Sequence, residues 1–375
     1  MFDKFKNILT AFQSPDNSVL GVDVGSSYLK IVQLRRKGGK AVLETYGSLA
    51  LGPYAGVEIG RATKLPQDKV AEAIRDLVRE AHVTTKSAAF SIPFTSSLVT
   101  PMDMRVLDPK QLSVSVPIEA RKYVPVPISE VNLDWWIIPE EPAVQETIGE
   151  PAAVDLSHVD PAAPRMMKIL IAAIHNEAMN RYQEIVTASG LESSFFEIEL
   201  FSAIRSLFPQ DLLPHAILDF GAGETKLYII DRGLVRQSHI INHGGQDITL
   251  ALSRSLGITV EEAELKKRAE GWNKHADHGT LTAILNGIFS ETNRVLQSFE
   301  RRFGRQVTNV ILSGGGANLL RIDELAQESC RVPVERADPF KQVEAPAFLD
   351  EVLKAVGPEF TVAVGIAFRK LQESG

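Results

Sequence analysis

The sequence has little cysteine and no long apolar run, and both absences exclude classes of protein. Cys330 is the only cysteine among 375 residues, so a disulfide framework and a thiolate metal cluster are excluded. No apolar stretch approaches the roughly 18 residues of a spanning helix, and the start lacks the basic-then-apolar pattern of a signal peptide. A net charge of -7 argues against a nucleic-acid-binding surface, which needs a basic stripe. We therefore expect a cytoplasmic protein that binds no nucleic acid.

Two common nucleotide-binding patterns are also missing. No Gly-Lys-Ser or Gly-Lys-Thr occurs, which excludes a Walker loop, and no segment reads Gly-x-Gly-x-x-Gly as a dinucleotide fold would. The proportions of 44% hydrophobic and 23% charged residues are those of a globular protein. The chain is longer than a single hydrophobic core usually supports, so two or more domains are expected.

Three glycine-rich segments follow apolar, β-branched runs. They are Gly21-Val-Asp-Val-Gly-Ser-Ser27, Leu218-Asp-Phe-Gly-Ala-Gly-Glu-Thr225 and Leu312-Ser-Gly-Gly-Gly-Ala317. In the first two, a predicted strand ends in an aspartate and a glycine hairpin with hydroxyls follows. Glycine lets backbone N–H groups approach phosphate oxygens, while an aspartate can hold the hydration shell of Mg2+. Each segment alone is ordinary turn chemistry, but their order resembles that of the actin, Hsp70 and sugar kinase superfamily.

The middle of the chain narrows this resemblance from the superfamily to particular families within it. The order of its strands and helices is similar to that of the cell-division protein FtsA and of the type IV pilus assembly protein PilM family. Residues 20–30, Glu119-Ala-Arg-Lys-Tyr-Val-Pro125 and the following Leu133-Asp134 resemble PilM segments in detail. The resemblance implies an α/β, two-lobed actin-like (ribonuclease H-like) ATPase fold with an inserted α+β subdomain in the first lobe.

The expected domain boundaries follow from this pattern. They are an N-terminal segment over 1–17, the first part of lobe 1 over 18–86, the inserted subdomain over 87–190 with a mobile loop over 139–165, the second part of lobe 1 over 191–215, and lobe 2 over 216–375 with a closing helix over 361–371. Apolar residues recur at helical spacing in the N-terminal segment. We favour a short helix docked on the body there, and a membrane-surface contact is the alternative.

The resemblance also implies residue roles for ATP and Mg2+. Asp23 and Asp219 would coordinate Mg2+ through water, unless they only cap turns. The residues expected to cradle the phosphates are Gly25, Ser26, Ser27, Gly221, Gly223 and Thr225. Lys30 follows the first hairpin, and two alternatives stay open for it: contact with a phosphate, or a position on an exposed strand face.

Other residues are expected around the nucleotide base and at the reacting water. Glu264 and Lys267 share one face of a predicted helix, so they either hold the ribose or base edge or form a solvated ion pair. Gly314, Gly315 and Gly316 would border the adenine. Glu199 lies where the superfamily often has a water-orienting residue, which makes it the candidate catalytic residue. Leu200 follows it where the family usually has proline, so we expect slow ATP hydrolysis or none.

The function implied by the resemblance is a nucleotide-dependent scaffold of the type IV pilus inner-membrane platform. Its expected partner is the cytosolic N-terminal tail of a PilN-like membrane protein, bound between the first lobe and the inserted subdomain. Pilus motor ATPases and further copies of the chain in a ring are also expected, and membrane contact would be indirect. Two alternatives remain, an FtsA-like filament protein of cell division and a small-molecule kinase of the same superfamily.

Overall fold

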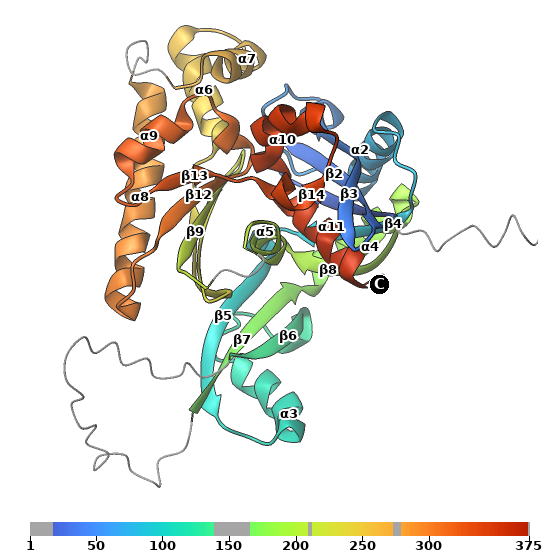
Figure 1. Ribbon diagram of the computed structural model, residues 1–375, viewed down its shortest axis with the longest axis vertical. Coiled ribbons are helices and arrows are strands. Elements are labelled where there is room, and N and C mark those ends of the chain that lie inside the picture. The colour runs from blue at the N-terminus through green and yellow to red at the C-terminus, as the bar shows by residue number, and fades with distance from the viewer. Residues whose placement is uncertain (1–17, 139–165, 209–211, 273–278, 374–375) are drawn as a thin grey trace, which may run out of the picture. The chain divides into compact units, whose positions relative to one another are not determined.

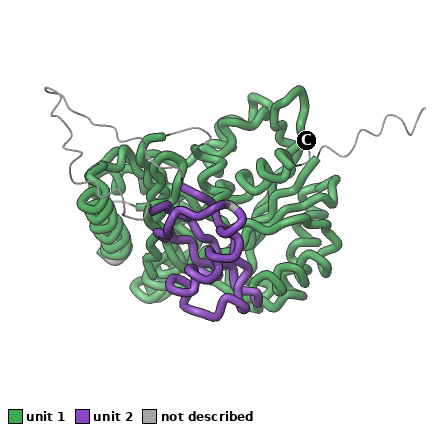
Figure 2. Tube along the Cα trace, turned by 90° about the horizontal axis from the view of Figure 1, so that it is seen from below, with its two compact units in different colours: residues 1–94, 178–375 green, residues 95–177 purple. Residues whose placement is uncertain are grey.

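The computed structural model describes residues 18–138, 166–208, 212–272 and 279–373. The helix expected in the N-terminal segment and the loop expected over 139–165 lie outside the described residues. The chain divides into two compact units (Figure 2): the first contains residues 1–94 and 178–375, and the second is Thr95–Glu177.

A six-stranded sheet organises one half of the first unit, which we call the first lobe (Figure 1). Its strands, in the order β14-β3-β2-β1-β4-β8, are β1 (Ser18–Val24), β2 (Tyr28–Lys37), β3 (Lys40–Ala50), β4 (Ser87–Ile92), β8 (Glu192–Ile198) and β14 (Val343–Glu344). β1, β2 and β3 form an antiparallel meander, whereas β4 pairs parallel to β1 and β8 pairs parallel to β4. β1 is buried along nearly its whole length, as expected for a central strand.

Helices cover both faces of this sheet. The helices of the first lobe are α2 (Gln67–Glu80), α4 (Asn176–Ser189), α5 (Glu199–Leu207) and α11 (Thr361–Glu373). Leu77 of α2 packs at Gly47, whereas Val32, on the other face, joins a cluster with Ala363 of α11. α11 approaches β1 closely because Gly21 has no Cβ; any Cβ there would collide with the carbonyl of Ala363. The helix expected over 361–371 is thus α11, and it packs on the first sheet.

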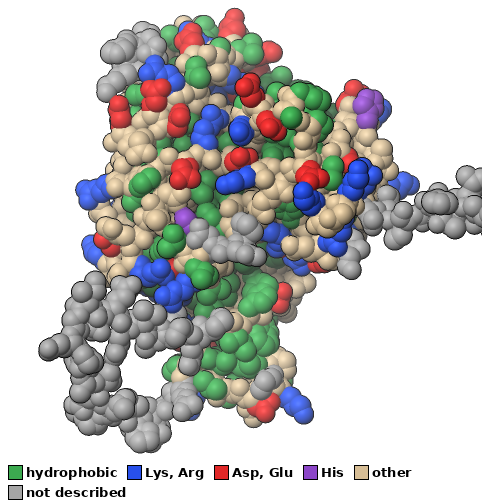
Figure 3. Space-filling model, viewed as in Figure 1, with side chains coloured by type: hydrophobic (Ala, Val, Ile, Leu, Met, Phe, Trp, Pro, Cys, Tyr) green, Lys and Arg blue, Asp and Glu red, His purple; other side chains and the backbone are tan. Residues whose placement is uncertain are grey.

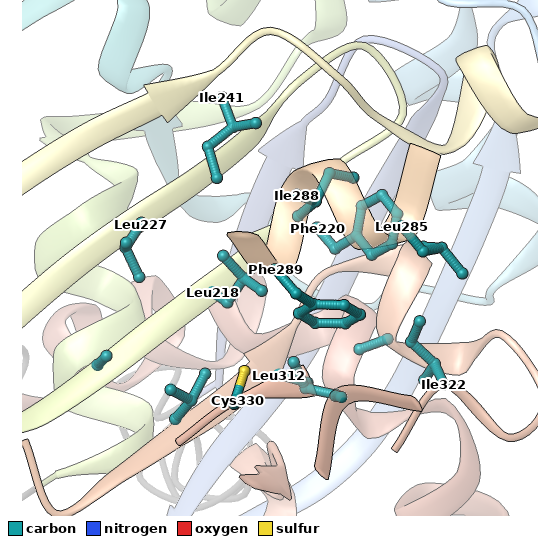
Figure 4. Packing of buried hydrophobic residues seen from close by; sticks show 14 of the residues in the cluster. Leu218, Phe220, Leu227, Ile241, Leu285, Ile288, Phe289, Leu312, Ile322 and Cys330 are labelled. Carbon is teal, nitrogen blue, oxygen red and sulfur yellow. The ribbon is translucent and has the colours of Figure 1, made fainter. Parts of the chain in front are cut away.

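The second lobe is built on a five-stranded sheet with the same plan. Its strands, in the order β11-β10-β9-β12-β13, are β9 (His215–Phe220), β10 (Thr225–Asp231), β11 (Leu234–Ile241), β12 (Asn309–Ser313) and β13 (Val334–Arg336). Its main helices are α6 (Gly245–Leu256), α7 (Val260–Glu270), α8 (Thr280–Phe303) and α9 (Ile322–Ser329), and α10 (Asp350–Val356) precedes α11. Again an antiparallel meander is followed by parallel strands. Phe220, Phe289 and Leu312 lie in its core, together with Cys330 (Figure 4).

The second unit has its own sheet and core. Strands β5 (Ser97–Arg105), β7 (Met166–His175) and β6 (Val131–Ile138) pair antiparallel in that order, and α3 (Pro109–Ala120) is the only complete α-helix among the described residues of this unit. Leu112, Val116 and Ala120 share one face of α3 and are buried in that core. Val114 and Ile118 occupy other positions on α3 and are exposed, and hydrophobic side chains are prominent on this unit in Figure 3.

The second unit is narrower than the expected span of 87–190. β4 was assigned to the inserted subdomain, but it completes the first sheet because Leu20, Gly21 and Val22 of β1 pair with it. Most of α4 also belongs to the first unit. We made no prediction from the sequence for β8, α5, α10 and β14. β8 and β14 pair with strands that are distant in sequence, so no local pattern reveals their partners.

Candidate functional site

The turns β1–β2 and β9–β10 occupy equivalent places in the two lobes, and each pairs an aspartate with a lysine. Asp23 lies opposite Lys30 in the β1–β2 register, and Asp219 lies opposite Lys226 in the β9–β10 register. The Lys30 Nζ is 3.4 Å from the Asp23 Oδ2, and the Lys226 Nζ is 3.9 Å from the Asp219 Oδ2. Both hairpins therefore carry a carboxylate and an ammonium group side by side.

Glycine closes both hairpins in the same way. The Gly25 N–H donates to the Tyr28 carbonyl at 3.0 Å, and the Gly221 N–H donates to the Glu224 carbonyl at 3.1 Å. A Cβ at Gly25 would lie 2.9 Å from the Tyr28 oxygen, and one at Gly221 would lie 2.7 Å from the Glu224 oxygen. Only glycine fits these turns, which keeps their backbone accessible to a ligand.

The two hairpins approach each other. The Ser26 Oγ is 3.6 Å from the position that a Cβ would take on Gly223. Ala62, from the loop that follows β3, is equally close to Gly223. Small residues from both lobes thus surround the same space, which suits a ligand held between two backbones.

The charges of both hairpins act on Asp219. The pKa of the Asp219 carboxyl is raised to about 6 overall, and burial is the largest cause. Lys226 and Lys30 lower this pKa, whereas Glu199 and Asp23 raise it. Asp219 is therefore within electrostatic reach of charged groups from both hairpins, and these groups form one cluster.

Lys30 belongs to this cluster and is not on an exposed strand face. Its side chain is 14% exposed. Burial alone would lower the pKa of Lys30, but the carboxylates of Asp23, Glu359 and Asp219 together raise it. Asp23 is held from its other side by the Ser91 Oγ, which donates to its Oδ1 at 2.9 Å. The first hairpin thus presents a protonated lysine beside a fixed carboxylate.

Glu199 is the first residue of α5 and is buried. Its Oε1 accepts the Phe94 N–H at 2.6 Å and the Lys226 Nζ at 2.7 Å. The oxygen expected to orient a water thus already has two donors, one from each lobe. Its side chain links the two lobes of the first unit.

Two hydroxyl residues expected at the phosphates are buried instead. Thr225 has no exposed surface, and its Oγ1 donates to the His243 carbonyl at 2.7 Å. Ser27 is 3% exposed. A buried hydroxyl must find a hydrogen-bond partner inside the protein, so the Thr225 hydroxyl supports the turn after β11. Ser26, which is exposed, is the hydroxyl residue of the first hairpin that a ligand can reach.

Glu264 and Lys267 do form a pair, but a buried one. The Lys267 Nζ lies 2.5 Å from the Glu264 Oε2 and also donates to the Thr249 Oγ1 at 2.9 Å and to the Gly245 carbonyl at 3.2 Å. Burial would raise the pKa of Glu264, yet Lys267 and the hydrogen bonds around the carboxylate lower it overall. The solvated ion pair that was the alternative for these residues is therefore not what forms.

The α6–α7 region also contacts the first lobe. The Ala62 N–H donates to the Gln246 Oε1 at 2.7 Å. Gly60 has a φ of +94°, and a Cβ there would lie 2.8 Å from the Glu264 Oε2. The loop after β3 therefore lies directly against α6 and α7.

The three glycines after β12 have different surroundings. A Cβ at Gly314, whose φ is +80°, would lie 2.5 Å from the Asp219 Oδ1. Gly316 packs against the Phe220 ring, whereas a Cβ at Gly315 would meet nothing within 4 Å. Of the three, only Gly315 opens onto free space, so the other two serve the packing of the second hairpin.

The carboxylates fit a partly hydrated cation. Among the described residues, no three His, Cys, Asp or Glu side chains are grouped so that they could hold a metal ion. Asp23 and Asp219 act on each other electrostatically, and Mg2+ commonly keeps several waters while one or two carboxylates and phosphates complete its shell. No helix in the described part of the chain is long and apolar enough to cross a membrane.

Sequence reasoning missed three residues of this cluster: Lys226, Ser91 and Glu359. Lys226 could have been found, because the spacing from Asp219 to Lys226 repeats the spacing from Asp23 to Lys30. Ser91 and Glu359 come from β4 and from the turn before α11, and nothing in their local sequence points to the hairpins.

Comparisons with known proteins give a consistent result. The model of the family described as type IV pilus assembly protein PilM matches residues 21–371. A solved PilM–PilN type IV pilus biogenesis complex has a chain that is 24% identical, with a TM-score of 0.77, covering 95% of this chain and 99% of that one. The cell division protein FtsA of Neisseria meningitidis is 24% identical over an alignment 360 residues long, which covers 85% of this chain and 82% of that FtsA.

A more distant solved structure shares the fold. MreB 5 of Spiroplasma citri, bound to AMPPNP, has a TM-score of 0.50 at 13% identity, covering 96% of this chain and 98% of that one. The expected two-lobed actin-like fold is thereby confirmed.

Proposed function

The chain belongs to the type IV pilus assembly protein PilM family, and from this premise we propose that it is a nucleotide-binding scaffold of the type IV pilus inner-membrane platform. It binds Mg-ATP where its two hairpins meet and binds the cytosolic tail of a PilN-like membrane protein. The observation that carries the nucleotide part is the repeated hairpin, in which Asp23 with Lys30 and Asp219 with Lys226 converge on one cluster.

The chemistry of the hairpins supports a polyphosphate. Backbone N–H groups near Gly25 and Gly223, the Ser26 hydroxyl and the Lys30 ammonium are donors suited to phosphate oxygens. When ionised, Asp23 and Asp219 can accept but not donate hydrogen bonds, so they would hold the water shell of Mg2+, which supplies positive charge beside the phosphates. The remaining expected contacts, Glu264, Lys267 and Gly315, are proposed to serve the ribose and base.

The chain is proposed to bind nucleotide without hydrolysing it rapidly. A general base must accept a proton from the attacking water. The Glu199 Oε1 instead already accepts the Phe94 N–H and the Lys226 ammonium, so this oxygen is not free to accept a hydrogen bond from the attacking water. The scaffold would therefore respond to whether a nucleotide is bound, and not to ATP hydrolysis.

The partner proposal is supported by the solved relative, which is a PilM–PilN complex. A PilN-like protein would keep this chain in the cytoplasm, peripheral to the inner membrane. Contacts with the pilus motor ATPases and with further copies of the chain complete the proposed platform.

Calorimetric titration of the full chain with Mg-ATP tests the nucleotide part. Wild type should bind, and Asp219→Asn should weaken binding of Mg-ATP by about tenfold or more because one carboxylate of the cation site is lost. Asp68→Asn, on an exposed position of α2, is the matched control and should bind as wild type does. An Asp219→Asn protein with unchanged affinity for Mg-ATP would contradict this assignment.

A second titration tests the partner. A peptide of the cytosolic tail of the PilN-like protein is added to the full chain with and without Mg-ATP. We expect binding whose affinity depends on the nucleotide. No binding in either state would remove the pilus assignment while leaving the nucleotide site standing.

An FtsA-like filament protein is the second candidate, favoured by the similarity to the Neisseria meningitidis FtsA. Sedimentation and electron microscopy with Mg-ATP separate the two. Long filaments formed without any PilN-like peptide would favour this candidate.

A further inference from the structure

Lys226 lies among three carboxylates at the base of the second hairpin. Its Nζ is 2.7 Å from the Glu199 Oε1, 3.8 Å from the Glu224 Oε1 and 3.9 Å from the Asp219 Oδ2. Its side chain is 11% exposed, and these carboxylates hold the pKa of the Lys226 ammonium above its ordinary value despite burial. Lys226 is thus a permanently charged, nearly buried cation beside the hairpin proposed to hold phosphate.

Lys226 is the internal counterpart of Lys30. Both face an aspartate across a glycine hairpin, and both hairpins reach the same cluster. Among the described residues, Asp23 is the one carboxylate within ion-pair distance of Lys30, whereas the shortest ion pair of Lys226 is with Glu199 from the other lobe. The two lysines therefore have similar access to a shared ligand but different resting partners.

Glu199 connects Lys226 to the segment that leads into the second unit. The same Oε1 that accepts the Lys226 ammonium also accepts the Phe94 N–H at 2.6 Å. Phe94 ends the first of the two segments that form the first unit, and Thr95 begins the second unit. Two hydrogen bonds to the same Glu199 oxygen thus connect Lys226 to Phe94, the residue that precedes the second unit.

Tyr228 packs on Phe94, and its buried hydroxyl has no hydrogen-bond partner among the described residues. Tyr228 lies on β10 two residues after Lys226, is 1% exposed, and its Oη makes no hydrogen bond in the described structure. Its ring packs edge-on against the Phe94 ring at 5.3 Å between centroids. The Phe94 N–H donates to Glu199, so Tyr228 and Glu199 contact the same residue. An unsatisfied buried hydroxyl is costly, so Tyr228 is placed to donate to Glu199 in a second arrangement.

We propose that Lys226 is a second phosphate-binding lysine, and that its transfer from Glu199 to a bound phosphate moves Glu199 from the Phe94 amide to the Tyr228 hydroxyl. The inference rests on the proposed nucleotide site. It adds a residue to that site and names the contact by which occupancy reaches the second unit.

The exchange of partners follows from charge. A terminal phosphate offers three acceptor oxygens and up to two negative charges, so it competes with a single carboxylate for the Lys226 ammonium. Glu199 then keeps only an amide donor, and a buried carboxylate without a cation is costly. A hydrogen bond from Tyr228 lowers that cost, and the Phe94 N–H loses its acceptor.

Calorimetry tests the phosphate contact. Lys226→Met should weaken Mg-ATP binding by about tenfold or more and leave adenosine binding unchanged, because only the phosphate contact is lost. Lys226→Arg should recover most of the affinity for Mg-ATP. Lys69→Met, which removes the lysine of an exposed ion pair on α2, is the control and should bind like wild type. A purely structural lysine would lower the melting temperature without this difference between ATP and adenosine.

Hydrogen exchange of a peptide spanning Phe94 tests the relay. In wild type, saturating Mg-ATP should speed exchange of the Phe94 amide by about tenfold, the loss of one hydrogen bond to a charged group. At saturating Mg-ATP, Lys226→Met should show no such change. Tyr228→Phe, which removes only the hydroxyl, should show a smaller change than wild type.

The outcomes separate this inference from the proposed function. If wild type binds no nucleotide, both are overturned. If wild type binds Mg-ATP but Lys226→Met binds it equally well, the inference alone fails. Unchanged exchange at Phe94 in wild type saturated with Mg-ATP also overturns the inference and leaves the nucleotide site intact.

Discussion

Arg268 of α7 reaches across to Tyr28 of the first hairpin. Its guanidinium donates to the Tyr28 Oη at 2.7 Å, and its Cζ lies 5.0 Å from the centroid of the tyrosine ring. Arg268 also pairs with Glu264, so this guanidinium is fixed from both lobes. The pair links the two lobes through a hydrogen bond and a cation–π contact.

Tyr28→Phe should destabilise the protein by about 1 kcal/mol, because the hydrogen bond is lost while the ring stays under Arg268. Urea unfolding of Tyr28→Phe, Arg268→Ala and the double variant measures the coupling. Tyr54→Phe is the control, since the Tyr54 hydroxyl bonds to Asp76 within the first lobe. Tyr54→Phe should be additive with Arg268→Ala, whereas additivity of Tyr28→Phe would mean that the two residues do not interact in solution.

Gly314→Ala should destabilise the second lobe by about 2 kcal/mol or more, because alanine resists a positive φ and its Cβ needs space that is taken. The φ at this position is +80°, and the Cβ would lie 2.5 Å from the Asp219 Oδ1 and 2.7 Å from the Phe220 carbonyl. Thermal unfolding measures the effect.

Gly287→Ala is the matched control for this substitution. Gly287 lies within α8, and its Cβ would meet nothing within 4 Å. Since alanine favours a helix over glycine, this variant should be stabilised by up to about 1 kcal/mol. Equal effects of the two substitutions would show that the backbone at Gly314 relaxes.

Glu197→Gln should destabilise the protein at pH 7 by about 3 kcal/mol, because it breaks a buried ion pair. Glu197 is 5% exposed; Arg205 donates to both its oxygens at 2.6 and 2.7 Å, and Arg369 donates at 2.8 Å. Burial would raise its pKa, but the two arginines and Ser202 hold the pKa of Glu197 below its ordinary value of 4.5.

The pH dependence of this effect has a definite sign. The folded-state pKa lies below the unfolded one, so the stabilisation is complete above about pH 4.5 and is lost as the pH falls through the folded-state pKa. Urea unfolding at several pH values should show the gap between wild type and Glu197→Gln closing only below pH 4.5. The gap for Glu72→Gln, an exposed pair with Lys69, should be near zero throughout.

Cys330 should be unreactive in the folded protein. It is 7% exposed in the core of the second lobe, and burial raises the pKa of its thiol to about 11, so little thiolate forms at neutral pH. Labelling with a thiol reagent at pH 8 should be at least about a hundredfold slower than labelling in urea, since it requires opening of the lobe. Rapid labelling without urea would show that this core opens readily.

Much of the fold was predictable where local chemistry and pattern agree. The predicted helix that carries Glu264 and Lys267 is α7; Thr259 and Glu262 form a capping box at its start, and Gly271 ends it with a φ of +60°. The strands that lead into the two glycine hairpins, β1 and β9, were also predicted, because each is an apolar run followed by a glycine turn. β8 and β14 were not predicted, because the strands with which they pair lie far away in the sequence.

The site was predictable in its residue types but not in its contacts. The order of the glycine-rich segments, with an aspartate in each of the two hairpins, led to the prediction of a phosphate site, and that role stays a prediction. The hydroxyl of Thr225 fits the same pattern, yet it faces the His243 carbonyl, because burial of the first residue of β10 decides its direction.

The sequence by itself determined two turns in which an aspartate, a glycine and a lysine follow at fixed spacing, since these depend on local backbone geometry. Only the tertiary structure decided that Lys226 pairs with Glu199 and that Glu199 accepts the Phe94 N–H. Those contacts join β10, α5 and the end of the β4 segment. Charge pairing in a buried site depends on which groups the packing brings together, and that information is absent from any single stretch of the chain.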